Sequence, residues 1–220
     1  MNASNATVAA IAVFSLGAIS ANAAVIVGTD FTGRTISGTT ATITDYTLNG
    51  ITDPGSWTVV SGNNLFTTTD AIGRFAVPEN PPSWSVTLPL TVGASAINLT
   101  DVTLNFESFT GGGASKVPSN FAPANNVTVE IRDNLNVLLA TQNLGQASGA
   151  TADAWIGTYT NFSTVTLAAG QTYSLKITTA GDAGNNLGID SFAINGALVP
   201  EPSIALLGGL GLVALLRRRR

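Results

Sequence analysis

The missing residue types restrict the chemistry of this chain more than the residues that are present. None of the 220 residues is Cys or His. Thiolate nucleophiles, disulfides, His-based catalytic triads and Cys/His zinc sites are therefore excluded. Any chemistry must come from carboxylates, hydroxyls, amides and aromatic rings, so the acidic and aromatic residues are considered first.

A glycoside hydrolase would need two carboxyl groups facing each other across a cleft. Glu107 and Glu130 are one such combination, because both fall on the polar face of a predicted strand. Solvent-facing positions on a sheet are the better explanation for both, and no pair stands out among the other acids. We therefore expect no catalytic residues and no enzyme, with a hydrolase as the least favoured alternative.

Sugar binding would favour an exposed aromatic platform beside polar side chains. Trp155, in the predicted loop TADAWIG, is the best candidate for such a ligand platform, although packing beneath that loop is the favoured explanation. Trp57 and Trp84 continue the apolar faces of predicted strands, so we expect both in the core.

A second loop offers oxygen atoms of the kind that bind calcium. It runs from Asp182 to Asp190 and reads DAGNNLGID. The spacing is not that of an EF-hand, and a turn-rich connection before the last strand explains it equally well. We therefore expect no metal or cofactor, with Asp182 and Asp190 as weak calcium candidates.

These residues must be positioned by a body in which apolar and polar residues alternate. Such alternation is typical of antiparallel strands with one buried and one wet face. The clearest strands are predicted at Trp84 to Leu90, Val102 to Phe106, Val127 to Ile131 and Tyr173 to Ile177. Weaker ones are predicted at Ala41 to Leu48, Trp57 to Val60, Ile72 to Val77, Val137 to Ala140, Asn161 to Leu167 and Ile189 to Asn195.

Roughly ten short strands separated by Gly, Asn, Asp and Pro predict an all-β fold. We expect an antiparallel β-sandwich of the jelly-roll type over residues 25–197. Asp133 to Asn136 should form a hairpin connection between two strands. Pro89 should lie on an edge strand or at a strand end, because proline cannot donate a hydrogen bond to a ladder.

The charge of this body argues against nucleic acid as a partner. Without Glu201 and the last four residues, all arginine, five basic and twelve acidic residues remain. An acidic surface repels phosphates, so we expect no binding to nucleic acid.

The first 23 residues have the order of a secretory signal peptide. An apolar run from Val8 to Ile19 is followed by Ala21 and Ala23, which flank Asn22 as a small-x-small cleavage site. We expect a signal-peptide helix that is removed after Ala23 or Ala24. The segment lacks the usual basic start, and a first buried strand or helix is the alternative.

The chain closes with an apolar run followed by a basic cluster. Ser203 to Leu216 would form a helix about 21 Å long, short of the roughly 30 Å of a bilayer core. Arginines at its end would keep that end on the cytoplasmic side. The sequence therefore predicts a marginal transmembrane helix with the body outside.

The last 22 residues resemble the PEP-CTERM sorting signal of Gram-negative bacteria. The resemblance rests on a triplet, a glycine-containing apolar segment and an arginine cluster in that order: Pro200, Glu201, Pro202; Gly208, Gly209, Gly211; and Arg217, Arg218, Arg219, Arg220. A similar triplet context from Val77 to Pro82 lacks the later parts and is expected to be an ordinary loop. A plain tail anchor is the alternative.

That resemblance implies export by the Sec machinery and recognition of Pro200, Glu201 and Pro202 by a membrane-embedded exosortase. It also implies an inner-membrane intermediate, followed by the cell surface or extracellular matrix. A structural or adhesive role among exopolysaccharide and biofilm is then the leading expectation.

A second resemblance covers Leu167 to Leu198. There, Tyr-x-Leu-x-Ile, a Gly/Asn-rich loop and Asp-x-Phe-x-Ile are similar to the closing strands of carbohydrate-binding-module-like jelly rolls. This supports the fold without establishing sugar binding. A lectin-like carbohydrate-binding module is the alternative function, with polysaccharide as its partner.

Overall fold

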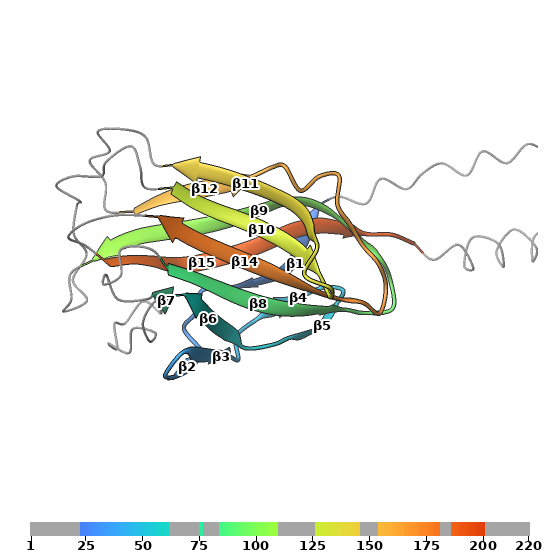
Figure 1. Cartoon of the computed structure of the whole chain (residues 1–220). Helices are drawn as coiled ribbons and strands as arrows, with labels where there is room; N and C mark the ends of the chain where they lie inside the picture. The colour runs from blue at the N-terminus through green and yellow to red at the C-terminus, as the bar shows by residue number, and fades with distance from the viewer. Residues whose placement is uncertain are drawn as a thin grey trace, which may run out of the picture.

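Two antiparallel sheets face each other and form a β-sandwich (Figure 1). The computed structural model describes residues 23–61, 75–76, 84–109, 126–145, 154–180 and 186–200, and within these ranges every regular element is a strand. The prediction of an all-β antiparallel fold is confirmed. The described strands begin at Ala24 and end at Leu198, close to the predicted bounds of the domain.

We name the two layers sheet A and sheet B. Sheet A has the strand order β12-β9-β15-β1-β4, with β13 beside β9 and β7 beside β15. Its strands are β1 (Ala24–Thr29), β4 (Thr47–Leu48), β7 (Phe75–Ala76), β9 (Ile97–Phe109), β12 (Ala154–Tyr159), β13 (Thr166–Leu167) and β15 (Asn186–Leu198).

Sheet B has the order β11-β10-β14-β8-β6-β3-β2, with β5 beside β8. Its strands are β2 (Arg34–Ser37), β3 (Thr40–Ile43), β5 (Ile51–Pro54), β6 (Trp57–Ser61), β8 (Trp84–Val92), β10 (Asn126–Asp133), β11 (Leu138–Gly145) and β14 (Thr172–Ala180).

The core lies between the sheets and is built from the apolar positions of each alternating strand. Val129 of β10 and Leu175 of β14 are buried from one side, and Leu104 of β9 is buried from the other. Trp57 and Trp84 are also buried, which confirms their predicted place in the core. Most intervening polar residues lie on the outer faces, as the period of two requires, whereas Ser85 and Thr179 are buried.

Several weaker strand predictions need correction. The segment Ala41 to Leu48 divides into β3 and β4, which belong to opposite sheets. Asn161 to Leu167 is mostly turns, in which Thr160 and Phe162 carbonyls accept from amides three residues on, and only β13 remains as a strand. Tertiary context overrides a weak local pattern in both cases.

The predicted hairpin connects β10 and β11. The Asp133 amide donates to the Val137 carbonyl at 3.0 Å, and Asp133 Oδ1 accepts from the amides of Leu135 and Val137. Asn136 has a φ of 65°, a conformation that Asn tolerates better than most residues. The predicted hairpin connection at Asp133 to Asn136 is therefore confirmed.

Pro89 lies in the interior of sheet B, so the prediction of an edge or strand end is wrong. It faces Ser174 of β14 on one side, while on the other side its carbonyl accepts from the Gly55 amide at 3.0 Å. The nitrogen and oxygen of one strand residue point the same way. The missing N–H therefore faces the break between β5 and β6, and the ladder to β14 stays intact.

The segments predicted to be helical at the two ends lie outside the described residues. Ala23 is exposed immediately before β1, whereas Ala21 precedes the described part. Pro200 is exposed after β15, whereas Glu201, Pro202 and the range 217–220 follow the described part. Among the described residues, no helix is long and apolar enough to cross a membrane.

Replacing Gly55 by Ala should destabilise the fold through the Pro89 ring. A Cβ at Gly55 would lie 2.6 Å from Pro89 Cγ. We expect Gly55→Ala to lower the free energy of unfolding by about 1–3 kcal/mol in urea denaturation. In a Pro89→Ala background the ring is absent, so the penalty should largely disappear. An equal penalty in both backgrounds would show that this contact is not the cause.

Candidate functional site

A hollow of about 490 Å³ lies on the outer face of sheet A beside β1. Its floor includes Gly28 of β1 and Ala193 of β15, which are paired across the sheet. Thr47 of β4 and Thr103 of β9 also line it. A Cβ at Gly28 would lie 3.0 Å from the Phe192 carbonyl oxygen, so the strands leave no comfortable room for a side chain there. We call this hollow the sheet A cleft.

One wall of the sheet A cleft is a loop shaped by its own side chains. Thr29 Oγ1 accepts from the Phe31 amide and donates to Asp45 Oδ1, both at 2.8 Å. Asp30 Oδ1 accepts from the amide of Thr32 at 3.0 Å and from its hydroxyl at 2.7 Å. Asp and Thr form such local bonds readily, so the local sequence TDFT (residues 29–32) favours these turns. The bonds hold Asp30 and Asp45 at the cleft.

Phe31 anchors this wall to the core. It is fully buried although its φ is 59°, a left-handed conformation that costs a bulky residue about 1–3 kcal/mol. Its ring lies 5.9 Å from the rings of both Trp57 and Phe192, which contact each other edge to face at 5.2 Å. Burial of these rings offsets the strain. The neighbours of Phe31 in the chain, Asp30 and Thr32, consequently face outward.

The two carboxyl groups of the wall converge on one hydroxyl. Thr32 Oγ1 lies 2.7 Å from Asp30 Oδ1 and 3.1 Å from Asp45 Oδ2. Hydrogen bonding with the Asp45 carboxyl, followed by the amide and hydroxyl of Thr32, lowers the pKa of Asp30 from 3.8 to about 2. Asp30 is therefore an ionised acceptor at neutral pH.

This arrangement favours binding over acid catalysis. A glycosidase acid must hold its proton near neutral pH, which requires a raised pKa, whereas the pKa of Asp30 is lowered. A single hydroxyl proton cannot fully satisfy both Asp30 and Asp45. The wall is therefore rich in acceptors, and a ligand that carries several hydroxyl donors would complement it.

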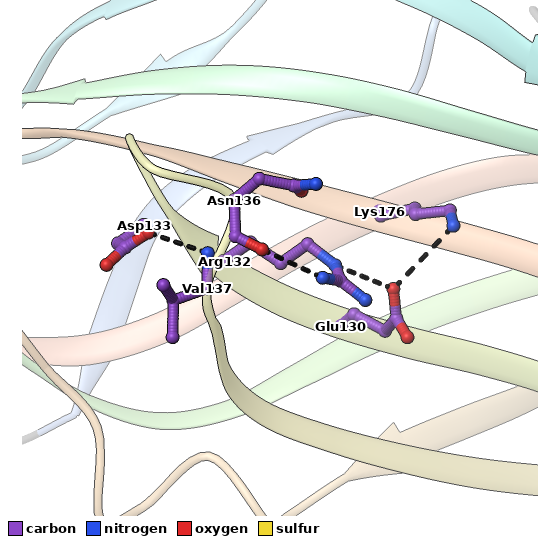
Figure 2. A network of polar contacts seen from close by, with 6 residues as sticks. All are labelled: Glu130, Arg132, Asp133, Asn136, Val137 and Lys176. Atoms are coloured by element: carbon purple, nitrogen blue, oxygen red, sulfur yellow. Dashed lines mark hydrogen bonds and ion pairs between the residues drawn. The ribbon is translucent and has the colours of Figure 1, made fainter.

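A smaller hollow of about 280 Å³ lies on the outer face of sheet B, beside a group of paired charges (Figure 2). Glu130 Oε2 lies 3.0 Å from Arg132 Nε and 3.8 Å from Lys176 Nζ, and Arg132 Nη1 donates to the Asn136 carbonyl at 3.0 Å. These contacts connect β10 to β14 and to the hairpin turn. Because Arg132 and Lys176 are both already paired with Glu130, and the hollow is smaller, it is the weaker candidate site.

The sequence-predicted carboxylates do not meet in the structure. Glu130 lies on β10 of sheet B and is held by Arg132 and Lys176, whereas Glu107 belongs to β9 of sheet A. The two residues considered as a pair for hydrolysis therefore lie on different sheets of the sandwich.

Of the two calcium candidates, Asp190 is among the described residues and Asp182 is not. Asp190 is the extra residue of a bulge in β15, between Ile189 and Ser191, and it is half-buried. Asp182 lies outside the described residues. Within the described part of the chain, no cluster of three or more acidic side chains could hold a metal.

Trp155 lies in a strand, so its predicted place in a loop is wrong. It belongs to β12, where it is paired with Phe106 of β9. The local sequence resembles a turn-rich connection, so it does not predict this strand. The strand forms because residues 154–159 pair with β9. The description does not extend to the Trp155 side chain, so its role as a platform stays a prediction.

The residues of the sheet A cleft were not singled out from the sequence. Asp30 and Asp45 are far apart along the chain and come together only because β2 and β3 turn back between them. The Asx-turn pattern of Asp30 and Thr32 could have indicated a shaped loop. It contains no signal for the convergence with Asp45.

No family model and no curated protein matches this chain. Among solved structures, one from work on carbohydrate-binding modules of the β-sandwich superfamily is similar over 76% of this chain and 57% of the matched chain. The sequence identity is 17% and the TM-score is 0.31. An isomalto-dextranase of Arthrobacter globiformis T6 complexed with panose matches 78% and 32%, with 9% identity and a TM-score of 0.38.

A fucose-binding module of Streptococcus pneumoniae matches 58% of this chain and 88% of its own, with 13% identity and a TM-score of 0.28. The chain spans little more than half of the first of these three structures and about a third of the second. Likeness at this level carries no argument about function, so the site must be judged by its own residues.

The lowered pKa of Asp30 predicts a contribution to acid stability. Folding lowers this pKa from 3.8 to about 2, so the contribution is present in full above about pH 4 and is lost as the pH falls toward 2. Asp30→Asn should therefore flatten part of the decline in unfolding free energy between pH 4 and pH 2, measured by urea denaturation. Parallel curves for the variant and the parent chain over that range would contradict the lowered pKa.

Proposed function

We propose that this chain is an exported carbohydrate-binding protein without catalysis of its own, and that the sheet A cleft binds the saccharide. The observation that carries this proposal is the convergence of Asp30, Asp45 and Thr32 on one wall of a hollow that Thr47 and Thr103 also line. Such a surface offers acceptors and hydroxyls in a concave space, which suits a ligand with many hydroxyl groups.

The charge of the sheet A cleft selects among saccharides. Asp30 and Asp45 are the charged residues that line it, and both are acidic. A uronate or sulfated sugar would place like charges together, which disfavours binding. A neutral or amino-substituted saccharide is therefore the expected ligand class.

Removing Asp45 should weaken saccharide binding. It contacts both Thr29 and Thr32, so Asp45→Ala removes an acceptor and loosens the wall. We expect affinity for a neutral polysaccharide to fall about tenfold or more, in calorimetry or on a glycan array.

The matched control for this experiment is Asp53→Ala, which removes an exposed acid from β5 of sheet B. It should leave binding unchanged, and both variants should be checked for thermal stability. Equal affinity of the parent chain and Asp45→Ala, or a preference for uronate polymers, would count against the sheet A cleft as the site.

A second candidate function concerns how the chain is handled after export. The pattern from Val199 to Arg220 resembles a PEP-CTERM signal, and the last described strand, β15, ends at Leu198. Pro200 is exposed and follows the folded body directly. This placement would leave the triplet accessible to exosortase and supports a role as a sorted component of the surface or matrix.

Sorting predicts a change in mass that depends on the enzyme. Expression in a host with exosortase should shorten the mature protein and release it from the membrane, as seen by mass spectrometry of the two fractions. Replacing Glu201 by Ala should leave the chain uncut, while Glu79→Ala in the similar internal triplet should not. Identical masses with and without exosortase would leave only a plain tail anchor.

A further inference from the structure

We propose that one end of the sandwich is a lipid-contacting surface, and that the tip of the β10–β11 hairpin dips into the membrane interface while the C-terminal tail is uncut. This inference rests on the tail candidate described above and goes beyond it, because it assigns a membrane contact to the folded body. We call this end of the sandwich the base.

Hydrogen bonds bring four segments together at the base. The Val199 amide donates to the Ala96 carbonyl, at the point where the chain leaves β15. The amide of Gly170 donates to the Gly93 carbonyl, and the amide of Gly93 donates to the Gly50 carbonyl. The turns after β4, β8 and β13 therefore surround the exit of the chain.

The β10–β11 hairpin belongs to the same end. Asp133, the last residue of β10, is paired with Tyr173 at the start of β14, and the preceding Gln171 accepts from the Val92 amide. Figure 1 shows the hairpin turning at the end of the sandwich where β15 finishes. Ala24 also starts there, paired with Gly196, so both ends of the described domain meet at the base.

The turns of the base carry few charges. Asp133 and Arg132 lie at the start of the hairpin turn, where their side chains bind its backbone, and Glu201 follows the exit in sequence. The remaining turn residues are uncharged. They consist of Asn49 and Gly50, residues 93–96 (GASA), residues 134–137 (NLNV) and residues 168–171 (AAGQ), with Val199 and Pro200 at the exit. Surfaces that must stay in water usually intersperse charges of both signs. A small, weakly charged and partly apolar surface is instead suited to the boundary between lipid and water.

The hairpin tip presents the apolar part of this surface. Leu135 is 78% exposed, Val137 54% and Leu138 43%. Leu135 and Val137 lie in the turn and Leu138 begins β11, and Asp133 makes this turn rigid through its contacts with the Leu135 and Val137 amides. A rigid apolar tip can enter an interface without an ordering cost for the loop.

The tail explains why lipid is the occupant of this surface. Ser203 begins the apolar run only three residues after Pro200, a reach of at most about 11 Å. If the run lies in the bilayer, the base must lie at its surface. The run itself would span only about 21 Å of a hydrocarbon core of roughly 30 Å. A second contact from the body would supplement this marginal anchor.

A fluorescent label at the hairpin tip tests the inference in the full chain. Because the sequence contains no Cys, Leu135→Cys gives a single labelling position. The labelled chain is reconstituted into vesicles of phosphatidylethanolamine and phosphatidylglycerol. We expect a blue-shifted emission and several-fold stronger quenching by nitroxide-labelled lipids than for a label in water.

The matched control is Ile156→Cys, which is 68% exposed on β12. Ile156 is paired with Asn105, eight residues along β9 from Ile97 and thus about 26 Å above the base. Its label should remain unquenched. Both positions are exposed, so neither substitution should disturb the core, and thermal denaturation would verify this.

Flotation of the same vesicles separates this inference from the tail candidate. A chain that floats while its Leu135→Cys label behaves like that at Ile156→Cys keeps the tail in the membrane but overturns the hairpin contact. A chain that does not float overturns both. A shift at Leu135→Cys that disappears when the protein-to-lipid ratio is lowered would indicate a second copy as the occupant and would also overturn the inference.

Discussion

The burial of Phe31 in a left-handed conformation is the constraint on which the candidate site depends. Its ring contacts Trp57 from sheet B and Phe192 from sheet A, so this cluster joins the two layers. The strain at Phe31 is tolerated because its neighbours over-determine it. The same backbone geometry directs Asp30 and Thr32 away from the core. Stability and site geometry are therefore set by one residue.

The alternating strands could be predicted because burial of one sheet face leaves a period of two in the sequence. Leu88, Leu104 and Leu175 carry that signal and lie in the core. The hairpin at Asp133 could also be predicted, since its turn depends on local hydrogen bonds. Edge strands such as β12, which contains Trp155, were missed because long-range pairing decides them.

The candidate site could not be predicted for the same reason. Asp30 and Asp45 are brought together by the return of the chain through β2 and β3, and Thr103 reaches the cleft from β9. The sequence gives the types of these residues but not the distances between them in space. Pro89 shows the converse: its missing N–H was recognised correctly, yet a break in the neighbouring strand meets that constraint in the sheet interior.

The positions of the sheet A cleft and the base are compatible with both proposals at once. The sheet A cleft extends along β1 from Val25, next to the base, to Thr29 at its acidic wall, and Thr29 lies five residues or about 16 Å from Ala24. A body resting on lipid through its hairpin tip would therefore hold the acidic wall of the cleft above the headgroups, on the flank of the sandwich. There the acidic wall formed by Asp30 and Asp45 would stay in water, where neutral polysaccharide outside the cell could reach it, while the weakly charged base meets the bilayer.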